Sequence, residues 1–318
     1  MFDVTALGEL LIDFVQDPKA ENMQFLANAG GAPANVLACL SRLGKKTAFI
    51  GKVGDDMFGS YLSDTLNRIG INTDGLVMSG DEFTTLAFVA LDDNGNRTFS
   101  FARKNSADVM LGASEVKLEL IGKSRIFHCG TLSLTHPCSG EAALVALKFA
   151  KEKEVCISVD PNLRLNLWES EAAAKEAIKL CLEYADIIKI SNYEVNFLYG
   201  DSGVKTAAEK IAAEYSPKII FITCGGNGAY MYLNGKIFFA PCYESIKPVD
   251  TTGAGDCFCG AALSRLLDFN LEFDRLSDKD CLDILNFANA AANLSTAKFG
   301  AIPSMPEKGD IEKLLNKC

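Results

Sequence analysis

Residues 250–256 read Asp-Thr-Thr-Gly-Ala-Gly-Asp, and the chain continues into a small, apolar stretch at 257–263, Cys-Phe-Cys-Gly-Ala-Ala-Leu. The apolar half has the composition of a buried helix, so the glycines lie where a loop becomes a helix N-terminus. Backbone N–H groups from Gly253 to Asp256 lack intrahelical partners there, and the positive end of the helix dipole adds to them. The stretch therefore predicts an anion site of phosphate size, with the Asp256 carboxylate, held ionised by the helix N-terminus, at its mouth.

Two better-known glycine motifs do not fit this stretch. A dinucleotide fingerprint needs glycine at position 258, where this chain has Phe258. A Walker loop needs GxxxxGK followed by Ser or Thr, which the sequence does not contain. An ordinary glycine-bearing loop capped by aspartate stays as the plain alternative, and the flanking threonines and aspartates favour function.

Outside this stretch, short apolar runs alternate with longer segments of helical period. The runs are Val4–Leu7, Thr47–Ile50, Ile126–Cys129, Cys156–Val159, Ile187–Ile190 and Ile219–Thr223. The helical segments are Ala34–Leu43, Tyr61–Ile69, Glu141–Lys151, Glu171–Tyr184 and Lys205–Glu214. Apolar runs without polar alternation are typical of parallel strands buried on both faces. The pattern predicts a doubly wound α/β layer.

Two segments depart from this alternation of apolar runs and helical segments. Leu86–Leu91 and Thr98–Arg103 alternate with period two and flank residues 92–96, which hold an Asn-Gly turn signal. With Leu10–Val15 and Met23–Leu26 they predict a small antiparallel sheet set apart as a lid. An edge hairpin on the main sheet is the alternative.

Composition excludes several classes of protein. The chain has 318 residues and a net charge of −10, with no long basic run, so neither nucleic acid nor an anionic membrane is an expected partner. No apolar stretch approaches the ~18 residues of a membrane span. The eleven cysteines show no repeated CxxC, and the first residues lack the basic segment of a signal peptide. We expect a reduced, cytoplasmic protein.

Three further segments hold candidate ligand groups. Residues 30–36, GGAPANV, place paired glycines and Asn35 at a helix start, and residues 223–228, TCGGNG, form a glycine-rich turn. Each is also explained by a simple turn. Residues 160–164, DPNLR, follow a strand end, where open α/β sheets gather ligand contacts.

Taken together, the segments 30–36, 223–228 and 250–258 resemble the ribokinase-like, or PfkB-type, carbohydrate kinases. The resemblance extends from Gly8-Glu9 to residues 300–303, GAIP, and includes VGDDMFG at 53–59. Within the family, residues 160–164 and 130–134 and the pair Leu167-Trp168 look most similar to fructokinases.

The resemblance implies a Rossmann-like three-layer, mostly parallel sheet with a small β-sheet lid. It implies one kinase domain over 1–318, with lid segments at about 10–30 and 84–105, shared across a homodimer. The implied reaction transfers the γ-phosphoryl group of ATP, with Mg²⁺, to a primary hydroxyl of a sugar, the 6-hydroxyl of fructose. 2-Keto-3-deoxygluconate, ribose and nucleosides are the alternative acceptors.

Matched position by position, the resemblance assigns the site residues. Asp256 matches the catalytic base, and Gly253, Ala254 and Gly255 match the anion hole. The positions matched to sugar contacts are Asp13, Gly30, Gly31, Asn35, Arg103, Arg164 and Asp256 itself. The positions matched to nucleotide contacts are Ser191, Glu194, Thr223, Gly225, Gly228, Gly255, Asn286 and Asn289.

Metal positions follow in the same way. Glu194 matches the residue that organises Mg²⁺ through water, although many members have Asn where this chain has Ser191. The positions matched to a monovalent cation such as K⁺ are Asp250, Thr252, Ser295, Gly300 and Ser304. Two other classes stay open: a nucleotide-dependent oxidoreductase, which Phe258 disfavours, and a non-catalytic sugar-binding protein, which the complete GAGD segment disfavours.

Overall fold

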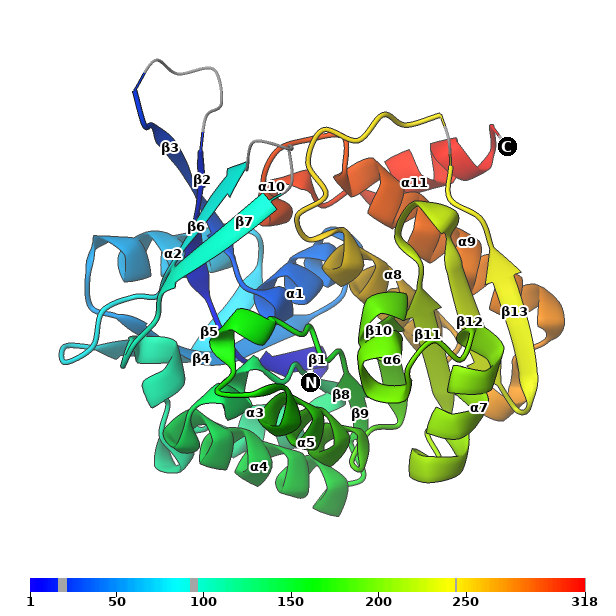
Figure 1. Ribbon diagram of the computed structural model, residues 1–318, viewed down its shortest axis with the longest axis horizontal. Coiled ribbons are helices and arrows are strands. Elements are labelled where there is room, and N and C mark those ends of the chain that lie inside the picture. Colours follow the sequence, from blue (N-terminus) through cyan, green and yellow to red (C-terminus); the bar gives the residue numbers. More distant parts are fainter. Residues whose placement is uncertain (17–21, 92–96, 244, 318) are drawn as a thin grey trace.

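The computed structural model describes residues 1–16, 22–91, 97–243 and 245–317. It contains a large main sheet with helices on both faces and a second, smaller sheet, the lid sheet (Figure 1). Within the described part of the chain, no helix is both long enough and apolar enough to cross a membrane.

The main sheet has nine strands and is mostly parallel. In spatial order they are β13 (Lys236–Ala240), β12 (Ala229–Leu233), β11 (Ile219–Thr223), β10 (Ile187–Ser191), β9 (Cys156–Val159), β8 (Ser124–Cys129), β1 (Phe2–Leu7), β4 (Thr47–Gly54) and β5 (Ile71–Ser79). Among the described ladders of the main sheet, only the pairs β11–β12 and β12–β13 are antiparallel. The lid sheet has the order β3 (Phe25–Gly30), β2 (Leu11–Gln16), β6 (Leu86–Leu91) and β7 (Arg97–Ala102).

Helices cover both faces of the main sheet. On one face lie α1 (Ala32–Arg42), α2 (Met57–Arg68), α8 (Ala254–Asp268), α9 (Asp278–Ser295), α10 (Ala301–Ser304) and α11 (Lys308–Leu315). On the other lie α3 (Leu118–Gly122), α4 (Pro137–Glu152), α5 (Glu171–Leu182), α6 (Asn192–Tyr199) and α7 (Val204–Tyr215).

Successive residues of one strand therefore belong to different cores. In β11, Ile219 and Phe221 pack into the core formed with α1, α8 and α9. Ile220 and Ile222 pack into the core formed with α4, α5 and α7. A strand buried in this way needs an apolar residue at every position, which is the pattern that the sequence shows. The doubly wound, three-layer prediction is confirmed.

Most predicted elements appear in the structure with small changes in their bounds. β9 and β11 have the predicted bounds, whereas β4 continues to Gly54. The sequence pattern did not indicate β5 (Ile71–Ser79), in which polar residues interrupt the apolar positions, or β13, a short edge strand that is largely exposed or half-buried.

The lid is a separate sheet, so the alternative of an edge hairpin on the main sheet is wrong. The prediction of a wholly antiparallel lid is also wrong, because β2 and β6 are parallel, with Ile12 opposite Leu86. β7 ends at Ala102, so Arg103 follows this strand instead of lying in it. The predicted Asn-Gly turn at 92–96 lies outside the described residues.

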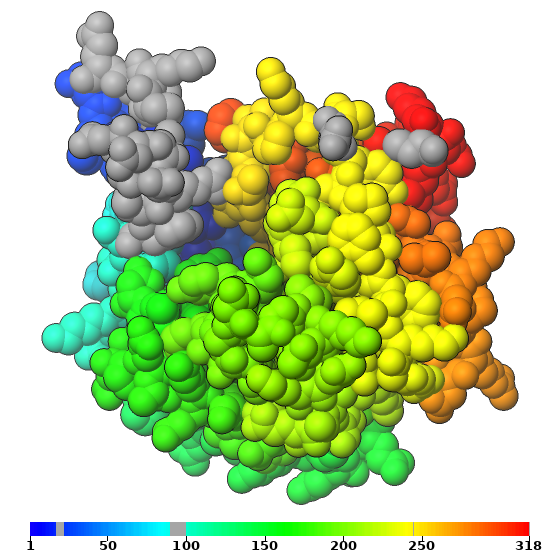
Figure 2. Space-filling view, turned by 45° about the vertical axis from the view of Figure 1, so that its right-hand side comes forward, coloured from blue at the N-terminus to red at the C-terminus, as the bar shows by residue number. Residues whose placement is uncertain are grey.

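Aromatic side chains attach the lid to the body of the molecule. The ring of Phe14 stacks on Phe88 at 5.3 Å between centroids and meets Phe58 of α2 edge-on at 5.7 Å. Figure 2 shows the blue and cyan surface of the lid side of the molecule beside the green surface of the main domain. The lid is thus held at one edge of the main sheet without being part of it.

The order of the strands defines where a ligand site should form. β1 lies between β8 and β4. The next strands of this sheet in sequence, β4 and β5, lie on one side of β1, and the strands from β8 to β13 lie on its other side. In an open α/β sheet, ligands bind outside the carboxyl ends of the strands near such a point. The loops that follow β1, β9 and β10 meet at the carboxyl ends of these strands.

Candidate active site

Asp256 lies in the first turn of α8 and is 7% exposed. The helix begins at Ala254, after Gly253, whose backbone has φ 75°. A Cβ at Gly253 would collide with the side chain of Ala301, so both conformation and space require glycine there. The predicted loop-to-helix turn is therefore present, with Asp256 buried at its start.

Two amides hold the Asp256 carboxylate. Nδ2 of Asn35 donates to Oδ2 at 2.8 Å, and Nδ2 of Asn162 donates to Oδ1 at 3.1 Å. Asn35 lies in the first turn of α1, and Asn162 follows β9 with φ 48°. The carboxylate is thus fixed by groups that lie 221 and 94 residues away in the sequence.

The start of α1 is held by a residue that the sequence analysis did not place in the site. Oε1 of Glu9 accepts a hydrogen bond from the backbone N–H of Ala32 at 2.8 Å. Burial raises the pKa of Glu9 to about 7, against the lowering effect of its own backbone hydrogen bond and of Arg103. Because the hydrogen bond from Ala32 to Glu9 holds the first turn of α1, Glu9 helps to keep Asn35 within hydrogen-bond distance of Asp256.

Burial works against the expected effect of the helix N-terminus on Asp256. The helix N-terminus was expected to hold the Asp256 carboxylate ionised, and burial raises the pKa of Asp256 above its ordinary value. The hydrogen bond from Asn35 and the positive charges of Lys189 and Arg164 oppose this rise in part. Desolvation of the carboxylate outweighs the effect of its neighbours.

Asp256 lies at the wall of a cavity of about 380 Å³, which we call the acceptor cavity. Its described lining is Glu9, Leu11, Asp13, Gly31, Ala32, Asn35, Phe101, Leu132, Asn162, Arg164, Lys189, Ser191, Glu194, Thr251, Thr252, Gly253, Gly255 and Asp256. The lid supplies Leu11, Asp13 and Phe101, and the loops of the main sheet supply most of the rest. A cavity with one apolar wall and many hydroxyl-binding groups suits a small polyol.

Asp13 is the lid carboxylate in this cavity. Burial raises its pKa to about 7, Arg164 opposes the rise, and Asp256 and Asp250 reinforce it. A Cβ at Gly30 would collide with the Asp13 carboxylate, so glycine at this position leaves room for Asp13. Gly30 itself, which was predicted to contact the sugar, does not line the cavity.

A second cavity of about 440 Å³, the nucleotide cavity, adjoins the first. Its described lining is Lys189, Ser191, Asn192, Thr223, Gly225, Gly226, Gly228, Cys242, Pro248, Thr251, Ala254, Gly255, Phe258, Asn289, Ala292, Asn293 and Thr296. A Cβ at Gly225 or Gly226 would meet open space, so the glycine-rich turn leaves room beside it. Lys189, Ser191, Thr251 and Gly255 line both cavities.

Ser191 and Glu194 begin α6 and cap it reciprocally. The Ser191 hydroxyl accepts from the Glu194 N–H, and Oε2 of Glu194 accepts from the Ser191 N–H at 2.7 Å. The other carboxylate oxygen accepts from the N–H of Leu163 at 2.7 Å. With both oxygens already hydrogen-bonded, Glu194 fits a role toward a metal ion through water better than direct ligation.

Lys189 was missed by the sequence analysis. Its Nζ donates to Oδ2 of Asp160 at 2.9 Å, and both side chains are buried. Burial opposes the charge of Lys189, but Asp160 and Glu194 together raise the pKa of Lys189 above its ordinary value. Burial likewise raises the pKa of Asp160 to about 7, with Lys189 opposing.

Several predicted site residues lie outside both cavities. The guanidinium of Arg103 donates to Asp108 at 2.8 Å and also binds Thr135 and the carbonyl of Leu132. Asn286 lines a different hollow, whereas Asn289 donates to the carbonyls of Ala240 and Pro241 beside the nucleotide cavity. Arg103 therefore fixes the loop that carries Leu132.

The residues matched to a monovalent cation lie on two loops that meet, which carry Asp250, Thr252 and Gly300, and at the ends of the neighbouring helices α9 and α10, which carry Ser295 and Ser304. Oδ1 of Asp250 accepts from the Thr252 N–H at 2.8 Å, and Oδ2 accepts from the Gly300 N–H at 3.0 Å. The hydroxyls of Ser295 and Ser304 donate to carbonyls within their own helices. The meeting loops present oxygen atoms from carboxylate, hydroxyl and carbonyl groups, which is the chemistry that alkali cations prefer.

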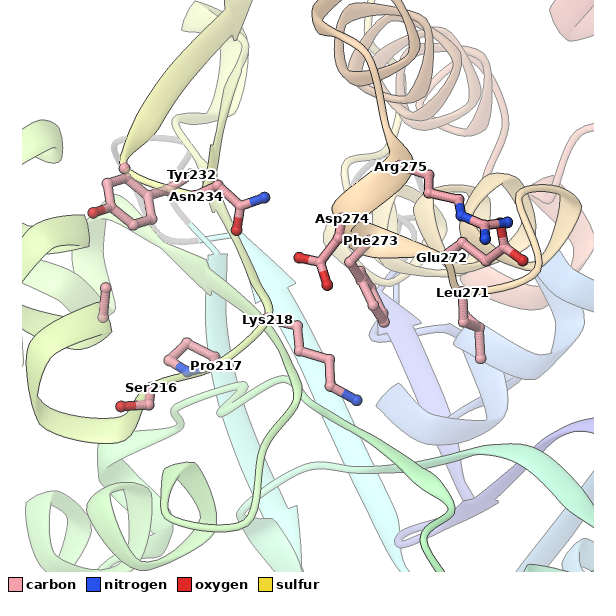
Figure 3. A pocket seen from close by; sticks show the side chains of 12 residues that line it. Ser216, Pro217, Lys218, Tyr232, Asn234, Leu271, Glu272, Phe273, Asp274 and Arg275 are labelled. Carbon is pink, nitrogen blue, oxygen red and sulfur yellow. The ribbon is translucent and has the colours of Figure 1, made fainter.

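A larger cavity, of about 660 Å³, lies elsewhere (Figure 3). It opens beside Lys218, which directly precedes β11, and so it lies at the opposite end of this strand from Thr223. None of the predicted site residues lines it. Size alone therefore does not identify the functional site, whereas the convergence of Asp256, the helix N-terminus and the two joined cavities does.

This fold and site define a class of protein: an α/β enzyme with two adjoining cavities that share the N-terminus of a helix, whose first turn carries a buried carboxylate. The sequence model described as pfkB family carbohydrate kinase matches residues 1–308, so the chain belongs to this family and is a phosphotransferase.

Relatives across the full length agree with this assignment. The chain is 42% identical to probable fructokinase-5 of Arabidopsis thaliana over 98% of this chain and 97% of that protein. It is 39% identical to Fructokinase-1 of Zea mays, covering 99% and 98% of the two chains.

Solved structures show the same fold. A fructokinase from Xylella fastidiosa with bound ATP superposes with a TM-score of 0.92 at 28% identity, covering 100% and 99% of the two chains. A double mutant of a Vibrio cholerae O395 fructokinase, bound to fructose, ADP and a potassium ion, superposes with a TM-score of 0.87 at 28% identity. It covers 99% of this chain and 98% of its own.

Proposed function

We propose that this kinase transfers the γ-phosphoryl group of ATP to the 6-hydroxyl of fructose. The observation that carries the proposal is the junction of the acceptor and nucleotide cavities at the start of α8, with Asp256 buried beside it. The full-length similarity to fructokinases supports fructose as the acceptor.

Asp256 would act as the general base. Its carboxylate is oriented by Asn35 and Asn162, which each donate to one oxygen, so each oxygen keeps a lone-pair direction for a sugar hydroxyl in the acceptor cavity. Because burial raises its pKa, this carboxylate accepts a proton more readily than an exposed aspartate would. It would orient the 6-hydroxyl and take its proton as the new O–P bond forms.

The start of α8 would stabilise the moving phosphoryl group. Phosphoryl transfer has a loose transition state, so positioning and charge stabilisation supply most of the catalysis. The first-turn N–H groups after Gly253 have no intrahelical acceptor and carry the positive end of the helix dipole. They lie between the two cavities, where charge develops during transfer.

The metal ions of the family fit the residues present. Glu194, through water, would hold Mg²⁺, which when bound neutralises charge on the nucleotide phosphates. The loops of Asp250 and Gly300 would hold K⁺, and the hydrogen bond between these two residues, with Asp250 shortly before the helix that carries Asp256, supports such a site. We further propose a cytoplasmic homodimer, and the exposed Leu26 and Met23 of the lid side support the dimer.

The lid would close over the acceptor before transfer. Asp13 and Phe101 reach the cavity from β2 and β7, so sugar binding and lid position are linked. Closure keeps water away from the γ-phosphoryl group and so limits wasteful hydrolysis of ATP.

The test is ADP release, coupled to an absorbance readout, with ATP and Mg²⁺ and a panel of fructose, 2-keto-3-deoxygluconate, ribose, glucose and adenosine. We expect turnover with fructose well above the rest, and little ADP release without sugar. Turnover with another member alone would contradict fructose as the substrate. Absence of turnover with every member, in folded protein, would contradict the proposed reaction.

A further inference from the structure

A cavity of about 550 Å³, which we call the C-terminal cavity, has no described lining residue in common with the acceptor and nucleotide cavities. It is enclosed by the ends of α1 and α9, by α10 and α11, and by residues 245–246 of the segment after β13. In Figure 1 the red C-terminal helices lie beside this yellow segment. The volume of the cavity is in the range of sites that bind small molecules.

The lining of this cavity is rich in positive charge. It contains four cationic side chains, Arg42, Lys298, Lys313 and Lys317, and two acidic ones, Glu307 and Asp310. Arg42 donates to Glu307 at 2.8 Å. Lys313 donates to Asp310 at 3.1 Å. Within the described part of the chain, Lys298 and Lys317 form no ion pair, so two positive charges remain without a partner.

This excess of positive charge distinguishes the cavity from the rest of the molecule, since the chain has a net charge of −10. The larger cavity of Figure 3 also contains two cations, but both are paired. Its Lys218 lies 3.3 Å from Asp186, and its Arg275 donates to Glu272 at 2.7 Å. Asp274 adds a further negative charge to that lining. The C-terminal cavity is therefore the one of the two that suits an anion.

The cavity also has an apolar wall. Met305 and Leu314 belong to the main hydrophobic core, and Ile246 and Leu294 pack against it. A ligand that fits both features has an anionic group and an apolar body. A phosphate monoester has a second pKa of about 6, so at neutral pH it carries close to two negative charges, which match the two lysines without a partner.

Met305 connects this cavity to the start of α8. It lines the cavity, and a Cβ built on Gly253 would lie 3.6 Å from its Cε. Gly253 directly precedes α8, whose first turn carries Asp256. Arg42, also in the lining, ends α1, whose first turn carries Asn35. A ligand that displaces Met305 or Arg42 would therefore act on the two helices that carry Asp256 and its hydrogen-bond donor.

We propose that the C-terminal cavity is an effector site for an organic phosphate monoester with an apolar body, whose phosphate is held by Lys298 and Lys317. Occupancy of the site changes nucleotide binding through the contact between Met305 and the start of α8. The site does not depend on which sugar is the acceptor, and only the nucleotide readout of its test rests on the proposed use of ATP.

The competing explanation is a solvated basic surface. Lys298 and Lys317 are exposed, and attraction between exposed charges is weak and screened by salt. The two explanations differ in how binding depends on the apolar body. A basic surface predicts equal binding of inorganic phosphate and phenyl phosphate, whereas the cavity predicts a preference for phenyl phosphate, whose ring would contact the apolar wall.

The experiment measures the affinity of the full chain for phenyl phosphate and for inorganic phosphate by nuclear magnetic resonance. Calorimetry then measures the affinity for ADP with Mg²⁺, with and without phenyl phosphate. The test variant is Lys298→Gln with Lys317→Gln. The matched control is Lys148→Gln with Lys210→Gln, because these exposed lysines of α4 and α7 carry the same charge but lie outside the described lining of the cavity. Thermal unfolding identifies any variant that is not folded.

We expect the wild type to bind phenyl phosphate at least about fivefold more tightly than inorganic phosphate, because the ring leaves water. The test variant should bind phenyl phosphate about tenfold more weakly or worse, since two charge-assisted contacts are lost. Phenyl phosphate should change the ADP affinity of the wild type at least about fivefold and leave that of the test variant unchanged. The control variant should behave as the wild type.

Equal affinities for the two probes, or undiminished binding of phenyl phosphate in the test variant, would overturn the site. A change in ADP affinity that persists in the test variant would mean competition in the nucleotide cavity, and this result or an unchanged ADP affinity in the wild type would overturn the coupling. If the test variant does not fold, Lys298→Gln and Lys317→Gln alone should each show part of the loss, and no loss in either would overturn the proposal. Binding of phenyl phosphate as expected by a chain that binds no ADP or turns over no sugar would contradict the proposed function alone.

Discussion

The main sheet is covered by helices on both faces, whereas the lid sheet has one aromatic cluster and leaves Leu26 64% exposed. The main sheet positions Asp160, Lys189 and Ser191 at the ends of neighbouring strands. The lid adds Asp13 from β2 and Phe101 from β7 to the same cavity.

This contrast separates two tasks. The groups proposed to act on the phosphoryl group come from strands and helices whose side chains are locked by packing, which keeps their geometry within narrow limits. The groups proposed to enclose the sugar come from the lid, which contacts the main domain through Phe14 and Phe58 and through Ile12 of the main core. We propose that the chemistry is built into the main sheet and that access is controlled from the lid.

The largest expected effect is on stability. Phe221→Ala in β11 removes a ring that is 1% exposed and packs edge-on against Phe258 at 5.8 Å. It should lower the free energy of unfolding by about 3–5 kcal/mol, since the core cannot close around the void. Phe88→Ala in the lid should cost only about 1 kcal/mol, because mainly the aromatic stacking is lost. Urea denaturation measures both.

The two variants should also differ in kinetics. Phe88→Ala should raise the KM for sugar and leave kcat near the wild-type value, while folded Phe221→Ala should keep both. Equal losses of stability in the two variants would show that the lid is part of the main folding unit, contrary to the comparison.

A smaller effect concerns pH. The pKa of Asp13 rises from 3.8 to about 7 in the folded chain, so between these values the folded state holds a proton that the unfolded chain has released. Stability from this group is therefore present below about pH 4 and is lost as pH rises to 7. In Asp13→Asn, the fall in the free energy of unfolding between pH 4 and pH 7 should be smaller by about 2 kcal/mol, after allowance for solvent screening.

The measurement is the free energy of unfolding between pH 4.5 and 8 without ligands. Asp64→Asn, on an exposed position of α2, is the matched control and should keep the wild-type slope. A slope that Asp13→Asn does not change would show that the lid leaves this carboxylate open to water.

Much of the main sheet was predictable, since Cys156–Val159 and Ile219–Thr223 are mostly apolar runs whose residues are almost all buried. The strand β5, Ile71–Ser79, was not, because its burial alternates with exposed polar positions. The direction of β2 relative to β6 depends on a long-range pairing of Ile12 with Leu86, which local patterns do not record.

The candidate site, too, was predictable only where its residues are close together in the sequence. Asp256 was identifiable because its glycines and helix are contiguous in sequence. Lys189 was not, because one lysine in an apolar strand gives no signal until the fold brings Asp160 within 2.9 Å. Arg103 matched a sugar-contact position, yet its place directly after β7 turns the guanidinium to Asp108.

The most direct test of the account is the turnover of Asp256→Asn, compared with Asp268→Asn at the far end of the same helix. We expect Asp256→Asn to remain folded, to bind sugar and nucleotide, and to lose turnover on the order of 10²-fold or more. Asp268→Asn should keep the wild-type rate. Turnover of Asp256→Asn near that of the wild type would contradict the assignment of the base and of the site built around it.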